Sequence, residues 1–389
     1  MAVTILKKSL LYLINLLSLA VFLLLPAYLV WSAPNLLGSL LPFREEAEVN
    51  PGPYGAEEIT PEEEIRQVLG QGKKLEHLEQ LQVQLKRFSG QQIQDNLFLT
   101  KDAMYENIPE PDPKTDASLS NANGMLEFVY RYYIPTYMML VPTACAIKQN
   151  DIPQNAPLFN QKNYIDGIYR DTSGVITSID AYSPLFASMD EYIYYRTMPE
   201  LTGLGGYYLY SVLGEKLSLR TRSLAQFEQI YLRHNCYGSL YQRLPYPAVQ
   251  PDIYSYYRMS LFQREYDMTR YESNGRVTRH SDIILPKVAD DSSKEITDVV
   301  LGGRAPLITI TVDGPYKDRL LIFGDQTVKA YIPFLAPHYK EIYIVDLELA
   351  DHAILDKLGI KHFDQVLFSY SVDTLFQRDF GEKLLYLAK

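Results

Sequence analysis

The segment Arg319–Leu335, RLLIFGDQTVKAYIPFL, constrains the fold more than any other part of the chain. Its apolar run Leu320–Phe323 predicts a buried strand, Gly324-Asp325 predicts a turn, and Thr327–Phe334 predicts the start of a helix. A strand, a sharp turn and a helix are how α/β enzymes expose a nucleophile at the carboxyl end of a sheet. The residue at that position is Gln326, and a primary amide cannot attack an ester.

Other apolar runs alternate with helical patterns along the rest of the chain. The predicted strands are Tyr137–Pro142, Val175–Tyr182, Tyr192–Arg196, Tyr266–Tyr271, Ile283–Pro286, Pro306–Val312, Glu341–Val345 and Gln365–Tyr370. The predicted helices are Met125–Tyr133, Asn160–Tyr169, Leu201–Leu217, a segment near Ser223–Cys236 and another near Ala350–Leu358. This alternation predicts a doubly wound, mainly parallel sheet in a three-layer, flavodoxin-like α/β fold.

The charge and composition limit the classes of partner. A net charge of −10 argues against nucleic acid, because no basic patch is present to neutralise phosphates. Two cysteines, Cys145 and Cys236, leave open one disulfide or two free thiols. Tyrosine is abundant, with 32 residues against 15 Phe, which suits either sugar-facing surfaces or ordinary half-buried strands.

The N-terminal region predicts a membrane anchor. Lys7 and Lys8 precede the apolar run Leu10–Trp31, whose 22 residues are enough for a helix to cross a bilayer. Lysines before the run and Glu45 and Glu46 after it place the N-terminus in the cytoplasm. A cleaved signal peptide is the alternative, although the run is long and its cleavage pattern is poor.

This pattern divides the chain into three parts. We expect a cytoplasmic stub and transmembrane anchor over residues 1–43, an extracytoplasmic helical stalk and linker over 44–122, and an α/β domain over 123–389. The main domain is then expected outside the cytoplasm, on a single-pass membrane protein.

Several stretches in the α/β part resemble one known family, the DHHW family of the SGNH hydrolase superfamily. They are YMMLVPTACAI (Tyr137–Ile147), YIYYRT (Tyr192–Thr197), GSLYQR (Gly238–Arg243), VVLGGRAPLITI (Val299–Ile310) and HYKEIYIVDL (His338–Leu347). The resemblance implies an SGNH-type fold, no cofactor, and a relation to proteins that acetylate alginate and other surface polysaccharides. It also implies an acetyl-supplying membrane-bound O-acyltransferase, or an intact DHHW protein, as a partner.

The residues that the family uses for catalysis are replaced in this chain. The Asp-His-His-Trp motif should follow Thr197, but Met198, Pro199, Glu200 and Leu201 stand there. By resemblance, that motif supplies the acid and histidine base that a serine nucleophile needs.

Two further family positions are altered. Where the family has Gly-Gly-Asn-His-Pro-Leu, this chain has Arg304 and Ala305 in place of the Asn and His. Where the family has an Asp-Ser pair, Asp325 is kept and Gln326 replaces the serine. We therefore expect a pseudoenzyme without catalytic residues, in which Thr327 is the one weak replacement nucleophile.

The resemblance still predicts a pocket at the carboxyl ends of the strands. Its candidate ligand-binding residues are Arg196, Glu200, Arg304, Asp325 and Gln326, which could hold a saccharide or an anionic group. No metal site is expected, because no histidine has ligand spacing with another ligand. We expect His338, His352 and His362 at the surface.

The sequence is compatible with three functions. The leading one is a cell-envelope pseudoenzyme that binds polysaccharide or serves as a non-catalytic subunit of exopolysaccharide O-acetylation. The second is an active acetylesterase or acetyltransferase that recruits Thr327 or Glu200. The third is a structural envelope protein in which side chains fill the space above Gln326.

Overall fold

The computed structural model describes residue 83 and residues 93–153, 156–260, 264–291 and 294–389. The chain divides into two compact units, Met1–Glu64 and Ile65–Lys389, and all described residues lie in the second. The predicted anchor Leu10–Trp31 lies outside the described residues. Within the described part of the chain, no helix is both long and apolar enough to cross a membrane.

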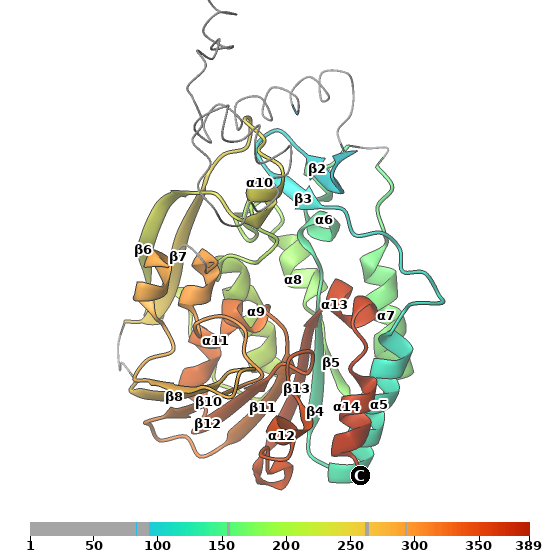
Figure 1. The fold of residues 1–389 in the computed structure, drawn as a ribbon, viewed down its shortest axis with the longest axis vertical. Coiled ribbons are helices and arrows are strands. Elements are labelled where there is room, and N and C mark those ends of the chain that lie inside the picture. The colour runs from blue at the N-terminus through green and yellow to red at the C-terminus, as the bar shows by residue number, and fades with distance from the viewer. Residues whose placement is uncertain (1–82, 84–92, 154–155, 261–263, 292–293) are drawn as a thin grey trace, which may run out of the picture. The chain divides into compact units, whose positions relative to one another are not determined.

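A mixed eight-stranded sheet forms the centre of this unit (Figure 1). Its strand order is β5-β4-β13-β11-β12-β10-β8-β9, in which the first five strands are parallel and the last three are antiparallel. The strands are β4 (Thr136–Val141), β5 (Thr177–Ile179), β8 (Tyr266–Tyr271), β9 (Val277–His280), β10 (Leu307–Val312), β11 (Arg319–Gly324), β12 (Glu341–Val345) and β13 (Gln365–Ser371). The chain therefore has an α/β fold with a large, mainly parallel sheet.

Helices cover both faces of this sheet. In Figure 1, α5, α7 and α14 lie on one side of the parallel strands, and α9 and α11 lie on the other. The longer helices are α5 (Ser118–Tyr132), α7 (Gln161–Asp171), α9 (Gly203–Lys216), α11 (Val328–Leu335) and α14 (Gly381–Leu387). Shorter ones are α6 (Ala144–Ile147), α8 (Tyr182–Ala187), α10 (Ser239–Arg243), α12 (His352–Leu355) and α13 (Val372–Gln377). The central strands are buried on both sides, which explains their continuous apolar runs.

Two small sheets flank the main one. One contains β1 (Ile93–Gln94), β2 (Leu97–Leu99) and β3 (Met104–Glu106), and the other pairs β6 (Phe227–Cys236) with β7 (Asp252–Met259). The first falls in the segment expected to be stalk and linker. Phe98 and Tyr105 instead pack into the main hydrophobic core, because their large side chains find apolar partners there.

Four sequence-based assignments are wrong. Ser223–Cys236 was expected to be helical, but most of it is strand β6, because tertiary pairing with β7 overrides its weak helical pattern. Tyr192–Arg196 and Ile283–Pro286 were expected to be strands, but each contributes only an isolated bridge, Tyr194–Leu201 and Ile284–Val300. His338 was expected at the surface but is buried, whereas His352 and His362 are exposed as expected.

Candidate functional site

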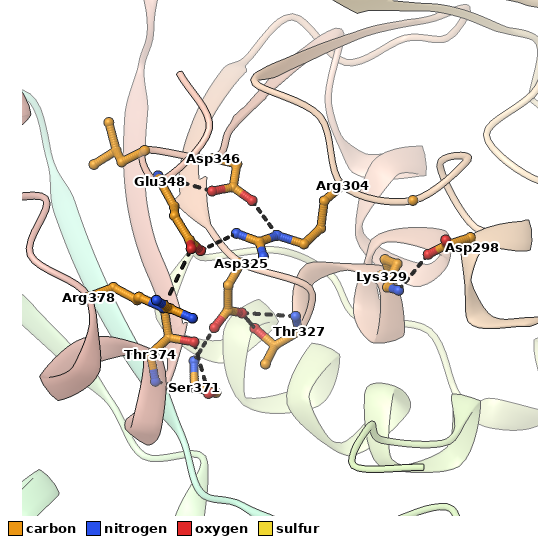
Figure 2. Close-up of polar contacts among 12 residues, drawn as sticks. Asp298, Arg304, Asp325, Thr327, Lys329, Asp346, Glu348, Ser371, Thr374 and Arg378 are labelled. Carbon is orange, nitrogen blue, oxygen red and sulfur yellow. Dashed lines mark hydrogen bonds and ion pairs between the residues drawn. The ribbon is translucent and has the colours of Figure 1, made fainter. Parts of the chain in front are cut away.

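The turn after β11 is fixed by the carboxylate of Asp325. Its Oδ1 accepts hydrogen bonds from the backbone N–H of Thr327 at 2.9 Å and from the Thr327 hydroxyl at 2.7 Å. Its Oδ2 accepts from the backbone N–H of Ser371 at 2.8 Å, which ties the end of β11 to the end of β13 (Figure 2). Asp325 is 5% exposed, so it is a buried anchor of the turn and does not face a ligand.

A cavity of about 140 Å³ lies beside this turn. Gln326 and Thr327 line it from one side, and Met198–Leu201 line it from another. The end of β4, the β7 tyrosines and Ser371 complete the wall. The structure therefore brings together the two segments in which the sequence analysis expected the family's nucleophile and its Asp-His-His-Trp motif.

The described wall of the cavity lacks the histidine that a serine triad requires. No histidine is among the described residues that line it. Met198, which is 1% exposed, packs so tightly that a Cβ on Gly238 would lie 1.8 Å from its Cγ. The side-chain amide of Gln326 faces the cavity and has no hydrogen-bond partner among the described residues.

Two hydroxyls in the cavity wall are already engaged. The Thr327 hydroxyl donates to Asp325, as described above. The Ser371 hydroxyl donates to the Asp373 carboxylate and accepts from the backbone N–H of Thr374 at the start of α13. The Ser371 hydroxyl therefore caps helix α13, and the Thr327 hydroxyl stabilises the turn after β11. Sequence reasoning did not single out Ser371, because serine before a helix has no distinguishing local signal.

Arg304 lies outside the main cavity. It lines a neighbouring void of about 20 Å³, to which Asp325 and Gln326 also contribute. Its guanidinium donates to Asp346 at 2.6 Å and to Glu348 at 2.6 Å, and Arg378 also approaches Glu348 (Figure 2). Burial alone would lower the pKa of Arg304, but these two carboxylates raise it. The Arg304 charge is therefore neutralised internally, and the expectation that it holds an anionic ligand gains no support.

Arg270 positions the loop that carries Arg304. It is 4% exposed on β8, and its guanidinium donates to the carbonyls of Leu301, Gly303 and Arg304. Gly303 has a φ of 90°, a left-handed conformation that glycine adopts without steric cost. Sequence reasoning missed Arg270, because an arginine in a strand normally points to solvent.

Arg196 also lies outside the main cavity. Its guanidinium lies over the Tyr192 ring, 4.4 Å from the ring centroid, and it lines a separate groove of about 290 Å³. The buried Asp252 of β7 accepts hydrogen bonds from the backbone N–H groups of Arg196 at 2.7 Å and Thr197 at 2.9 Å. Asp252 thus fixes the segment that leads to Met198, and no local sequence signal identified it.

The pKa values of two carboxyl groups in the cavity wall are raised above their ordinary values. Burial raises the pKa of Glu200, and the nearby Lys329 opposes this rise. Burial also raises the pKa of Asp373, while its hydrogen bond from Ser371 opposes the rise. Lys329 itself donates to Asp298 at 2.9 Å and to the Thr297 hydroxyl at 3.0 Å. The only cation in the described cavity wall is therefore already paired.

Neither a disulfide nor a metal site is found among the described residues. Cys145 and Cys236 are both buried free thiols, which answers the question that the sequence left open. Within the described ranges, no group of three or more His, Cys, Asp or Glu side chains is arranged to hold a metal ion.

The fold of this protein is similar to that of two solved structures. The structure is similar to a DHHW family protein from Eubacterium siraeum, with TM-score 0.61 and 21% identity over 73% of this chain and 91% of that one. It is also similar to Bacillus cereus PatB1 carrying a sulfonyl adduct, with TM-score 0.61 and 16% identity over 73% of this chain and 97% of that one.

The match to a family model shows the family to which this chain belongs. The model of the DHHW protein family matches residues 90–345, and this chain therefore belongs to the DHHW family. No curated protein matches the chain.

Proposed function

We propose that this chain is a non-catalytic, saccharide-binding member of the DHHW family that acts in cell-envelope or exopolysaccharide O-acetylation. The observation that carries the proposal is the cavity beside Gln326. It keeps about 140 Å³ of space and several polar groups, yet it holds neither a serine at position 326 nor a histidine in its described wall. A serine hydroxyl without a base is a poor nucleophile, and here even the hydroxyl at this position is absent.

The cavity also supports a ligand larger than one sugar. The separate groove beside Arg196 shares Gly203, Ser255 and Tyr257 with the wall of the cavity. One unit of a polysaccharide in the cavity could therefore be followed by a neighbouring unit in the groove. Open space beside Gln326 counts against a purely structural role, which requires side chains to fill that space.

The setting of this function rests on family membership and on the sequence. We propose that Leu10–Trp31 anchors the protein in the membrane and that the α/β domain works outside the cytoplasm. A membrane-bound O-acyltransferase, or an intact DHHW protein that performs the transfer, is the proposed partner.

Calorimetry on the full-length chain tests saccharide binding. We expect neutral oligosaccharides to bind, and we expect Gln326→Leu to weaken binding at least fivefold, because it removes an amide that faces the cavity without a protein partner. Gln377→Leu, an exposed position at the end of α13, is the matched control and should leave binding unchanged. Equal affinity for the Gln326→Leu variant and the wild type would mean that the ligand lies elsewhere.

An active esterase that uses replacement residues is the alternative. The observation that favours it is the Ser371 hydroxyl, which donates to the Asp373 carboxylate within the cavity wall. Ester hydrolysis that is lost in Ser371→Asn would support this alternative, because asparagine keeps the capping function but cannot act as a nucleophile. Loss of ester hydrolysis in Thr327→Ala would instead identify Thr327, the candidate from the sequence, as the nucleophile.

A further inference from the structure

The charged side chains in the cavity wall are mainly acidic. Glu106, Glu200 and Asp373 contribute carboxyl groups, and Lys329 contributes the single cation of the described wall. Lys329 is paired with Asp298, at 2.9 Å, so it offers little free positive charge to a ligand. An anionic ligand would therefore enter a poorly solvated space next to like charge, where electrostatic repulsion is only weakly screened.

Two tyrosines in the wall expose unpartnered hydroxyls. Tyr195 and Tyr254 are 2% and 3% exposed, and neither hydroxyl has a hydrogen-bond partner among the described residues. Glu200 lies close enough to raise the pKa of both. The Glu200 carboxyl group accepts a hydrogen bond from its own backbone N–H, and no other described residue donates to it. Buried polar groups without partners cost free energy, so this set indicates a polar ligand that both donates and accepts hydrogen bonds.

The aromatic rings add a second reason to disfavour anions. The rings of Tyr195 and Tyr254 stack with centroids 6.1 Å apart, and Tyr256 and Tyr257 extend the aromatic wall. The face of an aromatic ring carries partial negative charge, which attracts C–H groups and cations and repels anions. Tyrosine faces with nearby hydroxyl partners therefore suit the C–H and O–H groups of a neutral sugar.

The size of the cavity fits one sugar unit. Its volume of about 140 Å³ is far above the minimum of about 10–15 Å³ that one water molecule needs, so a small polar ligand can enter. A longer ligand would have to continue outside the cavity.

From these observations we infer that the cavity selects an uncharged sugar unit and excludes uronic acid units. Glu200 is the main determinant of this selectivity, because its carboxyl group forms no ion pair with a described residue and lines the same cavity as the two tyrosines. Glu106 contributes less, since it is paired with Arg243 at 2.9 Å. The inference rests on the proposed saccharide-binding function and names the class of sugar that the same site accepts.

Calorimetry with matched hexasaccharides tests the inference on the full-length chain. The probes are a β-1,4-linked glucose hexamer, an N-acetylglucosamine hexamer, a galacturonic acid hexamer and the methyl ester of that uronic acid hexamer. We expect at least one neutral hexamer to bind, the uronic acid hexamer to bind at least tenfold more weakly, and its methyl ester to recover most of the difference. The methyl ester removes charge from the ligand, so this comparison does not depend on any protein variant.

A charge-removing variant tests the role of Glu200. Glu200→Gln keeps the shape of the side chain and should reduce the discrimination between the uronic acid and its methyl ester at least threefold. Glu215→Gln, at an exposed position on α9, is the matched control and should leave the discrimination unchanged.

Different outcomes contradict the proposed saccharide-binding function and the selectivity for uncharged sugars. Equal binding of the uronic acid hexamer and its methyl ester would overturn the inference while the proposed function stands. Binding of none of the four hexamers would overturn the proposed function, and the inference with it. Unchanged discrimination in a folded Glu200→Gln variant would overturn the assignment of Glu200 as the determinant.

Discussion

Arg304 illustrates how a residue can be conspicuous in the sequence and still have a structural role. It lies between Asp346 and Glu348, and Asp346 is only 7% exposed. Burial raises the pKa of Asp346, and the hydrogen bond from Arg304 opposes that rise. The arginine therefore keeps a buried carboxylate charged, and it is not available to a ligand.

We predict that Arg304→Leu lowers the free energy of unfolding by about 2 kcal/mol at pH 7, because it leaves a buried carboxylate unpaired. The loss should shrink as the pH falls, since protonation of Asp346 removes the uncompensated charge. Urea unfolding at pH 7 and pH 5 measures both effects, with the exposed Arg279→Leu as control. A loss that is the same at both pH values would argue that the carboxylate is not responsible. Saccharide binding should be unchanged.

His338 is a second residue that makes the stability of the protein depend on pH. It is 2% exposed, and a hydrogen bond of 2.8 Å joins its Nε2 to the Tyr210 hydroxyl. Burial, together with Arg222 and Arg264, lowers its pKa from 6.5 to about 4. Below pH 6.5 the unfolded chain binds a proton at this histidine, while the folded chain resists protonation down to about pH 4. Stability should therefore fall as the pH falls through this window.

The expected size of the effect is about 3 kcal/mol between pH 6.5 and pH 4. His338→Gln removes the titrating group, so the wild type should lose about that much more stability than the variant over this range. Denaturant unfolding at a series of pH values gives the comparison. Parallel stability curves for the two proteins would show that His338 does not titrate as described.

At the scale of elements, the contact between α9 and α11 positions the helix that follows Gln326. Gly206 lies at this contact, and a Cβ there would be 1.9 Å from the Ala330 carbonyl oxygen. Backbone atoms cannot move aside as a flexible side chain can. The glycine therefore permits α9 to approach α11 closely.

We predict that Gly206→Ala lowers the free energy of unfolding by about 2–3 kcal/mol, because the helices must separate. Gly167→Ala is the matched control, since it lies in helix α7 and a Cβ there meets no atom within 4 Å. This control should instead stabilise the protein by about 0.5–1 kcal/mol through helix propensity. Thermal unfolding of both variants provides the measurement. A neutral Gly206→Ala would show that the two helices are not packed this closely.

Elements with strong local patterns were predictable from the sequence, and elements defined by distant partners were not. The prediction for Glu341–Val345 matches strand β12, because a continuous apolar run in a parallel sheet needs no information from elsewhere. Strand β6 was taken for a helix, because only its pairing with β7 makes it extended. The helix expected near Ala350–Leu358 is confirmed only as the short α12, His352–Leu355.

For the candidate site, the resemblance to the family located Met198–Leu201 and Gln326, which line one cavity. The sequence could not show that Arg196 and Arg304 lie outside that cavity, because their partners Asp252 and Asp346 are distant in the chain. The sequence also did not identify Tyr195 and Tyr254 as candidate ligand contacts, because 32 tyrosines give no basis for choosing two.

At the scale of the whole molecule, the cavity lies beside the carboxyl ends of β4 and β13 and beside the turn at Asp325. Asp325 holds this turn, and Gln326 lies where the resemblance to the family leads us to expect a serine. We propose that the protein recognises its ligand without transferring an acyl group.

Release of p-nitrophenol from p-nitrophenyl acetate by the full-length protein tests this central claim most directly. We predict a rate no higher than that of buffer with heat-denatured protein, and the same rate for Gln326→Ser, because a new serine would still lack a histidine base. Protein-dependent release by the wild type that disappears in Thr327→Ala or Ser371→Asn would contradict it.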